Sequence, residues 1–184
     1  LALLGTAALL SIIIGIPLGI YCSTRPRFYS FIRPIMDFMQ TMPAFVFMIP
    51  VIAFFGTGKV AAVIITMIFG GTPVVRLTVL GLKGVPQNIR EAAIAYGASK
   101  WYLLTKVDIP LATPTILAGV NQTVMLSLAM VVVASLIGAK GLGQDVLEAL
   151  QYANVGQGIL AGIAILFVAL LLDRIVPVSY THLR

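Results

Sequence analysis

The chain has 184 residues, of which 60% are hydrophobic and only 10% are charged. A soluble domain carries about 25% charged residues, so an ordinary water-soluble globular protein is excluded. The formal net charge of +6 comes from basic residues spread between apolar runs. This spread is unlike the dense basic, aromatic-containing patch that binds nucleic acid, and we expect no nucleic-acid partner.

Apolar runs of about 20 residues recur along the chain, which is the length that an α-helix needs to cross a bilayer. We therefore predict an all-α membrane protein, embedded in the lipid bilayer, with about five transmembrane helices. They are expected at residues 1–22, 35–55, 60–82, 114–137 and 156–172. Because the sequence begins with Leu1 inside an apolar run, without Met, we expect a chain truncated at its N-terminus.

The basic residues predict which links between spans face the cytoplasm. If the first and third links lie inside, most of the Lys and Arg residues are cytoplasmic, as the positive-inside rule requires. Arg76 is expected to extend its long side chain from the third span to the cytoplasmic headgroups. The cytoplasmic set is Arg25, Arg27, Arg33, Arg76, Lys83, Arg90, Lys100, Lys106, Arg174 and Arg184, against Lys59 and Lys140 outside.

The third link, residues 83–113, is too long for a turn and too polar for the lipid core. Asn88, followed three residues later by Glu91, resembles a capping box, and Pro86 precedes it. This pattern predicts a short helix at about residues 89–96.

A second short helix is expected in the same link. Gly97 suits the left-handed position after a helix, and Ser99 suits an N-cap. The second helix should then run to about residue 107, and Pro110 should break it.

The first of these helices would present small side chains. Ala92, Ala93 and Gly97 would let the backbone of another protein approach closely, while Arg90 and Glu91 offer charged hydrogen bonds at the edge. The pattern indicates a docking surface on the cytoplasmic side.

The order Glu91-Ala92-Ala93, then Gly97, then Ile109-Pro110 resembles the EAA signature of the permeases of bacterial ATP-binding-cassette (ABC) importers. The resemblance implies an EAA coupling loop that fits a groove of a separate cytoplasmic ATPase and transmits its closure to the membrane helices. Alternatively, Glu91 is only a helix cap and Gly97 only a helix stop. A purely connecting loop would span about 2–8 residues, which favours coupling. The coupling site would comprise Glu91, Ala92, Ala93, Gly97, Ile109 and Pro110.

Further stretches are similar to the glycine betaine/proline betaine permease family, at residues 39–45, 74–78 and 119–123, and 141–143 matches a wider importer motif. The resemblance covers nearly all of a permease domain at 1–175. It implies a type I ABC importer permease in the bacterial plasma membrane, paired with a second copy. It also implies two ATPases that bind ATP and Mg²⁺, and an extracytoplasmic substrate-binding protein or fused receptor domain. No cofactor is expected in this chain.

Polar residues within the spans are candidates for the translocation path, because they are costly in lipid. Hydrogen bonding between helices explains them at least as well. Phe38 and Phe45, seven residues apart, should share one helix face that could attract a quaternary ammonium group, although packing is the simpler explanation. Asp37 is explained by a local ion pair with Arg33. The path candidates are Gln40, Thr41, Phe45, Asn121 and Gln122, with Thr123 and Ser127 as further polar positions.

Two remaining segments carry less information. Leu142, Val146 and Leu150 recur at four-residue spacing and predict a short interfacial helix, either an outer gate or receptor contact, or only a surface helix. The tail at 176–184 departs from the family pattern and resembles translated adapter sequence, although a genuine short tail is possible. We assign it no function.

The sequence contains no catalytic triad, metal-binding cluster or carboxylate pair, and its one histidine, His182, is isolated. We therefore expect no catalytic residues, no metal site and no enzymatic chemistry. The favoured function is import of a quaternary ammonium osmolyte by a permease subunit. Three alternatives remain: an ABC permease for choline, carnitine or an amino acid; an ATPase-independent channel or secondary transporter; and a membrane scaffold.

Overall fold

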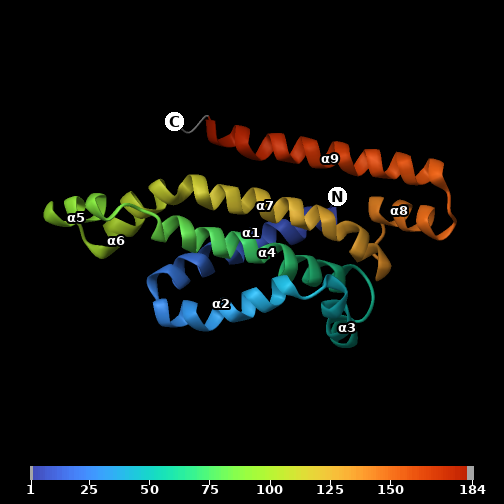
Figure 1. Cartoon of the computed structure of the whole chain (residues 1–184), viewed down its shortest axis with the longest axis horizontal. Coiled ribbons are helices and arrows are strands. Elements are labelled where there is room, and N and C mark those ends of the chain that lie inside the picture. The colour runs from blue at the N-terminus through green and yellow to red at the C-terminus, as the bar shows by residue number, and fades with distance from the viewer. Residues whose placement is uncertain (1, 182–184) are drawn as a thin grey trace.

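All regular secondary structure is helical over the residues that the computed structural model describes, Ala2–Thr181. Side chains are described in this range except those of Leu4 and of residues 175–181. Successive long helices run in alternating directions (Figure 1). The helices α5 and α6 lie at one end of the bundle, and α3 and α8 lie at the other. The elements are α1 (Ala2–Thr24), α2 (Pro26–Thr41), α3 (Ala44–Phe55), α4 (Lys59–Lys83), α5 (Gln87–Ala95), α6 (Lys100–Tyr102), the π-helix η1 (Leu103–Asp108), α7 (Ile109–Leu136), α8 (Leu142–Gln151) and α9 (Val155–Thr181).

Four helical segments in the described residues are long and apolar enough to cross a membrane, and the bent pair α2–α3 makes a fifth if it counts as one span. The prediction of an all-α protein with about five membrane helices is therefore confirmed. The four segments are Gly5–Thr24, Lys59–Lys83, Lys100–Leu136 and Val155–Arg174.

The helices α1, α4 and α7 form the centre of the bundle, and small residues let them approach closely. A Cβ atom on Gly15 would lie 2.4 Å from Cγ1 of Val74, and one on Gly19 would lie 2.6 Å from Cβ of Thr78. Val74 and Thr78 are fully buried on α4. Close backbone contact between small residues is how membrane helices associate where lipid removes most of the hydrophobic driving force.

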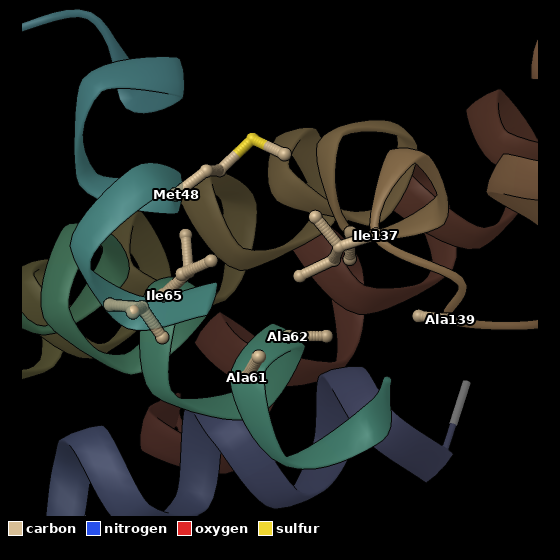
Figure 2. Packing of buried hydrophobic residues seen from close by; sticks show 8 residues of the cluster. Met48, Ala61, Ala62, Ile65, Ile137 and Ala139 are labelled. Atoms are coloured by element: carbon tan, nitrogen blue, oxygen red, sulfur yellow. The ribbon is translucent and has the colours of Figure 1, made fainter. Parts of the chain in front are cut away.

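A second cluster of buried side chains closes the bundle at the end that carries α3. Figure 2 shows Met48 of α3 over Ile65 of α4, with Ile137 next to them and Ala139 beyond it. Ala61 and Ala62 provide the small surface on α4. The cluster fixes the short helix α3 to the ends of α4 and α7.

The span predicted at residues 35–55 is not one continuous helix, because the chain forms two helices there that meet at 105°. Met42 is extended, with φ −75° and ψ 137°, and Pro43 is the N-cap of α3. A proline disfavours the helical conformation of the residue before it, so the helix ends at this point. The helix α2 also begins at Pro26, inside the segment predicted as a link. Phe38 and Phe45 consequently lie on different helices and do not share a face.

Pro110 does not break the second helix of the third link, contrary to prediction. The helix continues from Lys100 to Leu136, and the six residues before Ile109 widen into a π-helix. Pro110 lacks the N–H that would bond to the carbonyl of Lys106 in a regular α-helix. A π-turn, with its different bonding pattern, accommodates this loss without ending the helix.

The last two helices flank the centre of the bundle. The short helix predicted there is confirmed as α8, and α9 packs against α8 and α7. The predicted domain boundary at residue 175 falls within α9, and residues 182–184, which include His182, lie outside the described part of the chain.

Candidate functional site

The segment between α4 and α7 forms an ordered projection at one end of the bundle (Figure 1). Its first helix, α5, ends in a Schellman motif, in which the Gly97 N–H donates to the Ile94 carbonyl at 2.9 Å and the Ala98 N–H to the Ala93 carbonyl at 3.0 Å. Gly97 has a φ of +82°, so the predicted left-handed glycine is confirmed.

The start of α5 differs from prediction. The helix begins at Gln87 with Pro86 as its N-cap, and no side chain caps it, so the capping box of Asn88 and Glu91 does not form. Proline fixes its own φ near the value needed to lead into a helix, which makes a side-chain cap unnecessary here. The Glu91 carboxylate instead accepts a 3.0 Å hydrogen bond from Gln87 Nε2. The prediction that Ser99 caps the second helix is confirmed, because its hydroxyl accepts from the Tyr102 N–H at 3.2 Å.

Arg90 attaches α5 to both long helices that flank the loop. Its Nε donates to Oδ1 of Asp108 in η1 at 2.7 Å, and its Nη2 donates to the carbonyl oxygen of Leu82 at 2.6 Å. The Leu82 carbonyl belongs to the last turn of α4, where backbone acceptors have no helical partner and where a cation is favoured. Arg90 is therefore an internal anchor. The sequence had suggested a different role for it, at the edge of the docking surface.

Small and aromatic side chains share the outer side of the projection. Tyr96 is 95% exposed and Trp101 is 74% exposed, which is unusual for aromatic residues that have no partner. An open depression of about 420 Å³ is lined by Tyr96, Gly97 and Tyr102, among others. We refer to Glu91, Ala92, Ala93, Tyr96, Gly97, Trp101 and Tyr102 as the loop surface.

The six predicted coupling residues occupy two different environments. Glu91, Ala92 and Gly97 are exposed, and Ala93 is half-buried where it lines the depression. Ile109 packs inward against the cluster of Leu82, Ala112 and Ile116. Pro110 is exposed at the start of α7.

Two features that shape this site were not predicted from the sequence: the exposed aromatic residues and the partner of Arg90. Tyr96, Trp101 and Tyr102 are aromatic residues concentrated in a polar link, and this concentration was a readable signal. Asp108, which is buried against Arg90, had no such signal, because the two residues are 18 positions apart and on separate helices.

The predicted path residues lie on three helices. Gln40 and Thr41 are exposed near the end of α2, and Phe45 is exposed on α3. Gln122 is exposed on α7, whereas the Asn121 amide donates to Asp173 of α9 at 3.1 Å. This last contact is the interhelical hydrogen bond that was the alternative explanation.

Thr123 and Ser127 are fully buried on α7. The Ser127 hydroxyl donates to the Thr123 carbonyl at 2.8 Å. Both side chains therefore face protein.

Arg76 does not simply extend to the membrane surface. Its guanidinium pairs with the carboxylate of Asp37 on α2, which also lies 3.8 Å from Nε of Arg33. The local pair of Arg33 and Asp37 is confirmed, but the principal partner of Asp37 is Arg76. Among the described residues, no group of three or more His, Cys, Asp or Glu side chains could hold a metal ion.

Comparisons with known proteins agree with this architecture. Residues 11–184 match the family described as binding-protein-dependent transport system inner membrane component. The inward-facing MetNI methionine ABC transporter aligns with a TM-score of 0.84 over 96% of this chain and 91% of that one, at 21% identity. At this identity the likeness shows the fold alone, which is that of an ABC importer permease.

Two curated proteins are much more similar in sequence. The chain is 49% identical over 175 residues to the glycine betaine/proline betaine transport system permease protein ProW of Escherichia coli, covering 95% of this chain and 49% of that protein. It is also 49% identical to the glycine betaine transport system permease protein OpuAB of Bacillus subtilis, covering 95% of this chain and 62% of that protein. The chain thus spans about half to three-fifths of the length of these relatives.

Proposed function

The chain belongs to the family of binding-protein-dependent transport system inner membrane components, and from this premise we propose that it is the permease subunit of an ATP-driven importer. It forms the translocation path for glycine betaine, proline betaine or a related quaternary ammonium osmolyte, and it performs no covalent chemistry itself. A separate cytoplasmic ATPase binds ATP and Mg²⁺ and supplies the energy.

The observation that carries this proposal is the loop surface. Apart from the half-buried Ala93, its residues are exposed at the end of the bundle to which the basic residues assign the cytoplasm. Small side chains beside exposed aromatic rings suit a protein groove, since aromatic residues dominate the energetics of protein contacts. We assign the coupling role to Glu91, Ala92, Ala93 and Gly97 on this surface, with Ile109 and Pro110 setting the start of α7.

The anchoring of the loop supports a mechanical role. Arg90 connects α5 to the last turn of α4 and to η1, which continues into α7. A displacement of α5 by a bound ATPase is therefore passed to two membrane helices through charged hydrogen bonds. ATP-driven closure biases the permease between inward-open and outward-open states, which requires only a difference in binding free energy between them.

The assembly that we propose contains a second copy of this permease, two ATPases and an extracytoplasmic substrate-binding protein or fused receptor domain. The family description supports a binding protein, and the permease fold supports the ATPase. The translocation path would lie between the two copies, with Gln40, Thr41, Phe45, Asn121 and Gln122 as candidate lining residues.

The cargo assignment rests on the relatives. Those at 49% identity are named for glycine betaine and proline betaine. A relative at 44% identity, from Pelagibacter ubique, is named for trimethylamine N-oxide, and one at 31%, from Listeria monocytogenes, is named for carnitine. All of these compounds carry a fully substituted, positively charged nitrogen, so that group is the feature we expect the cargo to share.

The test is uptake by reconstituted vesicles. The permease is reconstituted with its ATPase, loaded receptor and internal ATP, and radiolabelled glycine betaine is measured inside over time. We expect accumulation only when ATPase and ATP are both present. Accumulation by the permease alone would identify an ATPase-independent channel or secondary transporter and would contradict the proposal.

A further inference from the structure

The geometry points to a contact for a zwitterionic cargo at the ion pair of Asp37 and Arg76, on a polar stripe of α2 that lines the translocation path. This inference rests on the proposed function and adds the residues that touch the cargo. Arg76 would bind the carboxylate of the cargo, and Asp37 would attract its quaternary ammonium group.

Arg76 lies deep enough in the membrane to need an explanation. It is seven residues before Lys83, the last residue of α4, which places it about 10 Å from that helix end. The hydrocarbon core is about 30 Å thick and α4, with 25 residues, is about 38 Å long, so a centred α4 places the Arg76 backbone inside the core. Charged residues at such positions almost always face a bundle interior or a water-filled cavity.

Its partner is on a different helix and is accessible. The side chain of Asp37 is 48% exposed and that of Arg76 is 39% exposed, although the two form an ion pair. In a membrane, an exposed ion pair that faced lipid would be strongly unfavourable. The exposed side of the pair therefore faces water or another subunit.

The helix α2 is divided into two faces that agree with this placement. Arg33 lies four residues before Asp37, and Gln40 and Thr41 lie three and four residues after it, so all three share the side of the helix that carries Asp37. A neighbouring side of α2 is apolar and, with α1 and α4, lines a cavity of about 220 Å³. The α2 residues that line it are Ile32, Ile35, Met36 and Met39. Met36 of this apolar side is buried against Val74 and Val75 of α4, whereas the side chains of Asp37 and Arg76 stay partly accessible. We therefore assign the polar stripe to the path.

The charges on this stripe match a zwitterion. The guanidinium of Arg76 can bind a carboxylate through two parallel hydrogen bonds, and the second arginine, Arg33, leaves the cluster with one net positive charge. A quaternary ammonium has no N–H to donate, so its attraction to the carboxylate of Asp37 is purely electrostatic. A half-exposed ion pair is held weakly, and a passing cargo can exchange places with either partner.

The test uses the complete reconstituted transporter with Asp37→Asn and Arg76→Gln. We expect the maximal rate of glycine betaine uptake to fall at least tenfold in each, with receptor-stimulated ATP hydrolysis and the melting temperature in detergent unchanged. Arg76→Lys, which keeps the positive charge, should retain more uptake than Arg76→Gln. The control is Arg27→Gln, an exposed arginine near the start of α2 and outside the stripe, which should transport like the parent chain.

Four results would overturn the inference. The first is normal uptake by both variants, and the second is an equal loss of uptake in Arg76→Lys and Arg76→Gln. The third is a lower melting temperature together with uptake restored by the exchange Asp37→Arg/Arg76→Asp, which indicates a structural pair. The fourth is leakage of betaine without ATP, which indicates a gate. Failure of the proposed function is distinct from all of these, because the parent transporter itself would then show no ATP-dependent uptake.

Discussion

The centre of the bundle and the loop surface are stabilised by different means. In the centre, Gly15 and Gly19 bring the backbone of α1 against fully buried side chains of α4. On the loop surface, the rings of Tyr96 and Trp101 are largely exposed. Arg90 connects α5 to the bundle through two charged hydrogen bonds. The centre is thus closely packed, while the exposed rings of the loop suit the contact with an ATPase that we propose. Substitutions should separate these two roles.

The largest effect is expected from Gly19→Val in the centre. A Cβ at this position already lies 2.6 Å from the Thr78 Cβ and 3.0 Å from the Val75 carbonyl oxygen, so the helices must separate. We expect the free energy of unfolding to fall by about 3 kcal/mol, measured by thermal melting in detergent. Gly162→Ala is the control, because a Cβ there meets nothing within 4 Å. Equal stability of the two variants would show that α1 and α4 are not closely packed.

Arg90→Ala should release the loop without disrupting the centre. It leaves Asp108, whose side chain is 10% exposed, without its cation, and it removes the donor to the Leu82 carbonyl. We expect local opening of α5 to become easier by about 1–2 kcal/mol, measured as faster amide hydrogen exchange in residues 87–95. Gln87→Ala, which removes only the exposed bond to Glu91, is the control and should exchange like the parent. If Arg90→Ala also exchanged at the parental rate, Arg90 would not be the anchor.

Gly97→Ala tests the turn between α5 and α6. Open space surrounds the position, but its φ of +82° is unfavourable for a residue with a Cβ. We expect a loss of about 1 kcal/mol in the stability of the loop, measured by hydrogen exchange. Gly162→Ala makes the same change in equally open space within a helix, and it should be neutral or stabilising. The same sign for both would contradict the strain argument.

The features that could be predicted from the sequence were local ones. Hydrophobic runs gave the membrane helices, and Gly97 and Ser99 marked the loop turn, because each depends on neighbouring residues only. The break between α2 and α3 at Pro43 and the π-helix before Pro110 depend on how the surrounding structure accommodates a proline. The local sequence pattern does not determine this.

The features that could not be predicted were long-range pairs. Arg76 meets Asp37 across 39 positions, and Arg90 meets Asp108 across 18. Nothing in the spacing of these residues signals the pairing, because it follows from the packing of α2 on α4 and of α5 on η1. The anchoring of the loop and the charged contact in the proposed path therefore required the structure.

The central claim is that the loop surface is the point where ATP-driven motion enters the membrane domain. It is tested most directly by Glu91→Lys in vesicles that contain the complete transporter, with ATP hydrolysed and glycine betaine imported measured in the same sample. Because Glu91 is exposed and bonds only to Gln87 among the described residues, folding and membrane insertion should be unchanged. We predict at least a tenfold rise in ATP consumed per betaine imported, and a ratio equal to that of the parent chain would contradict the account.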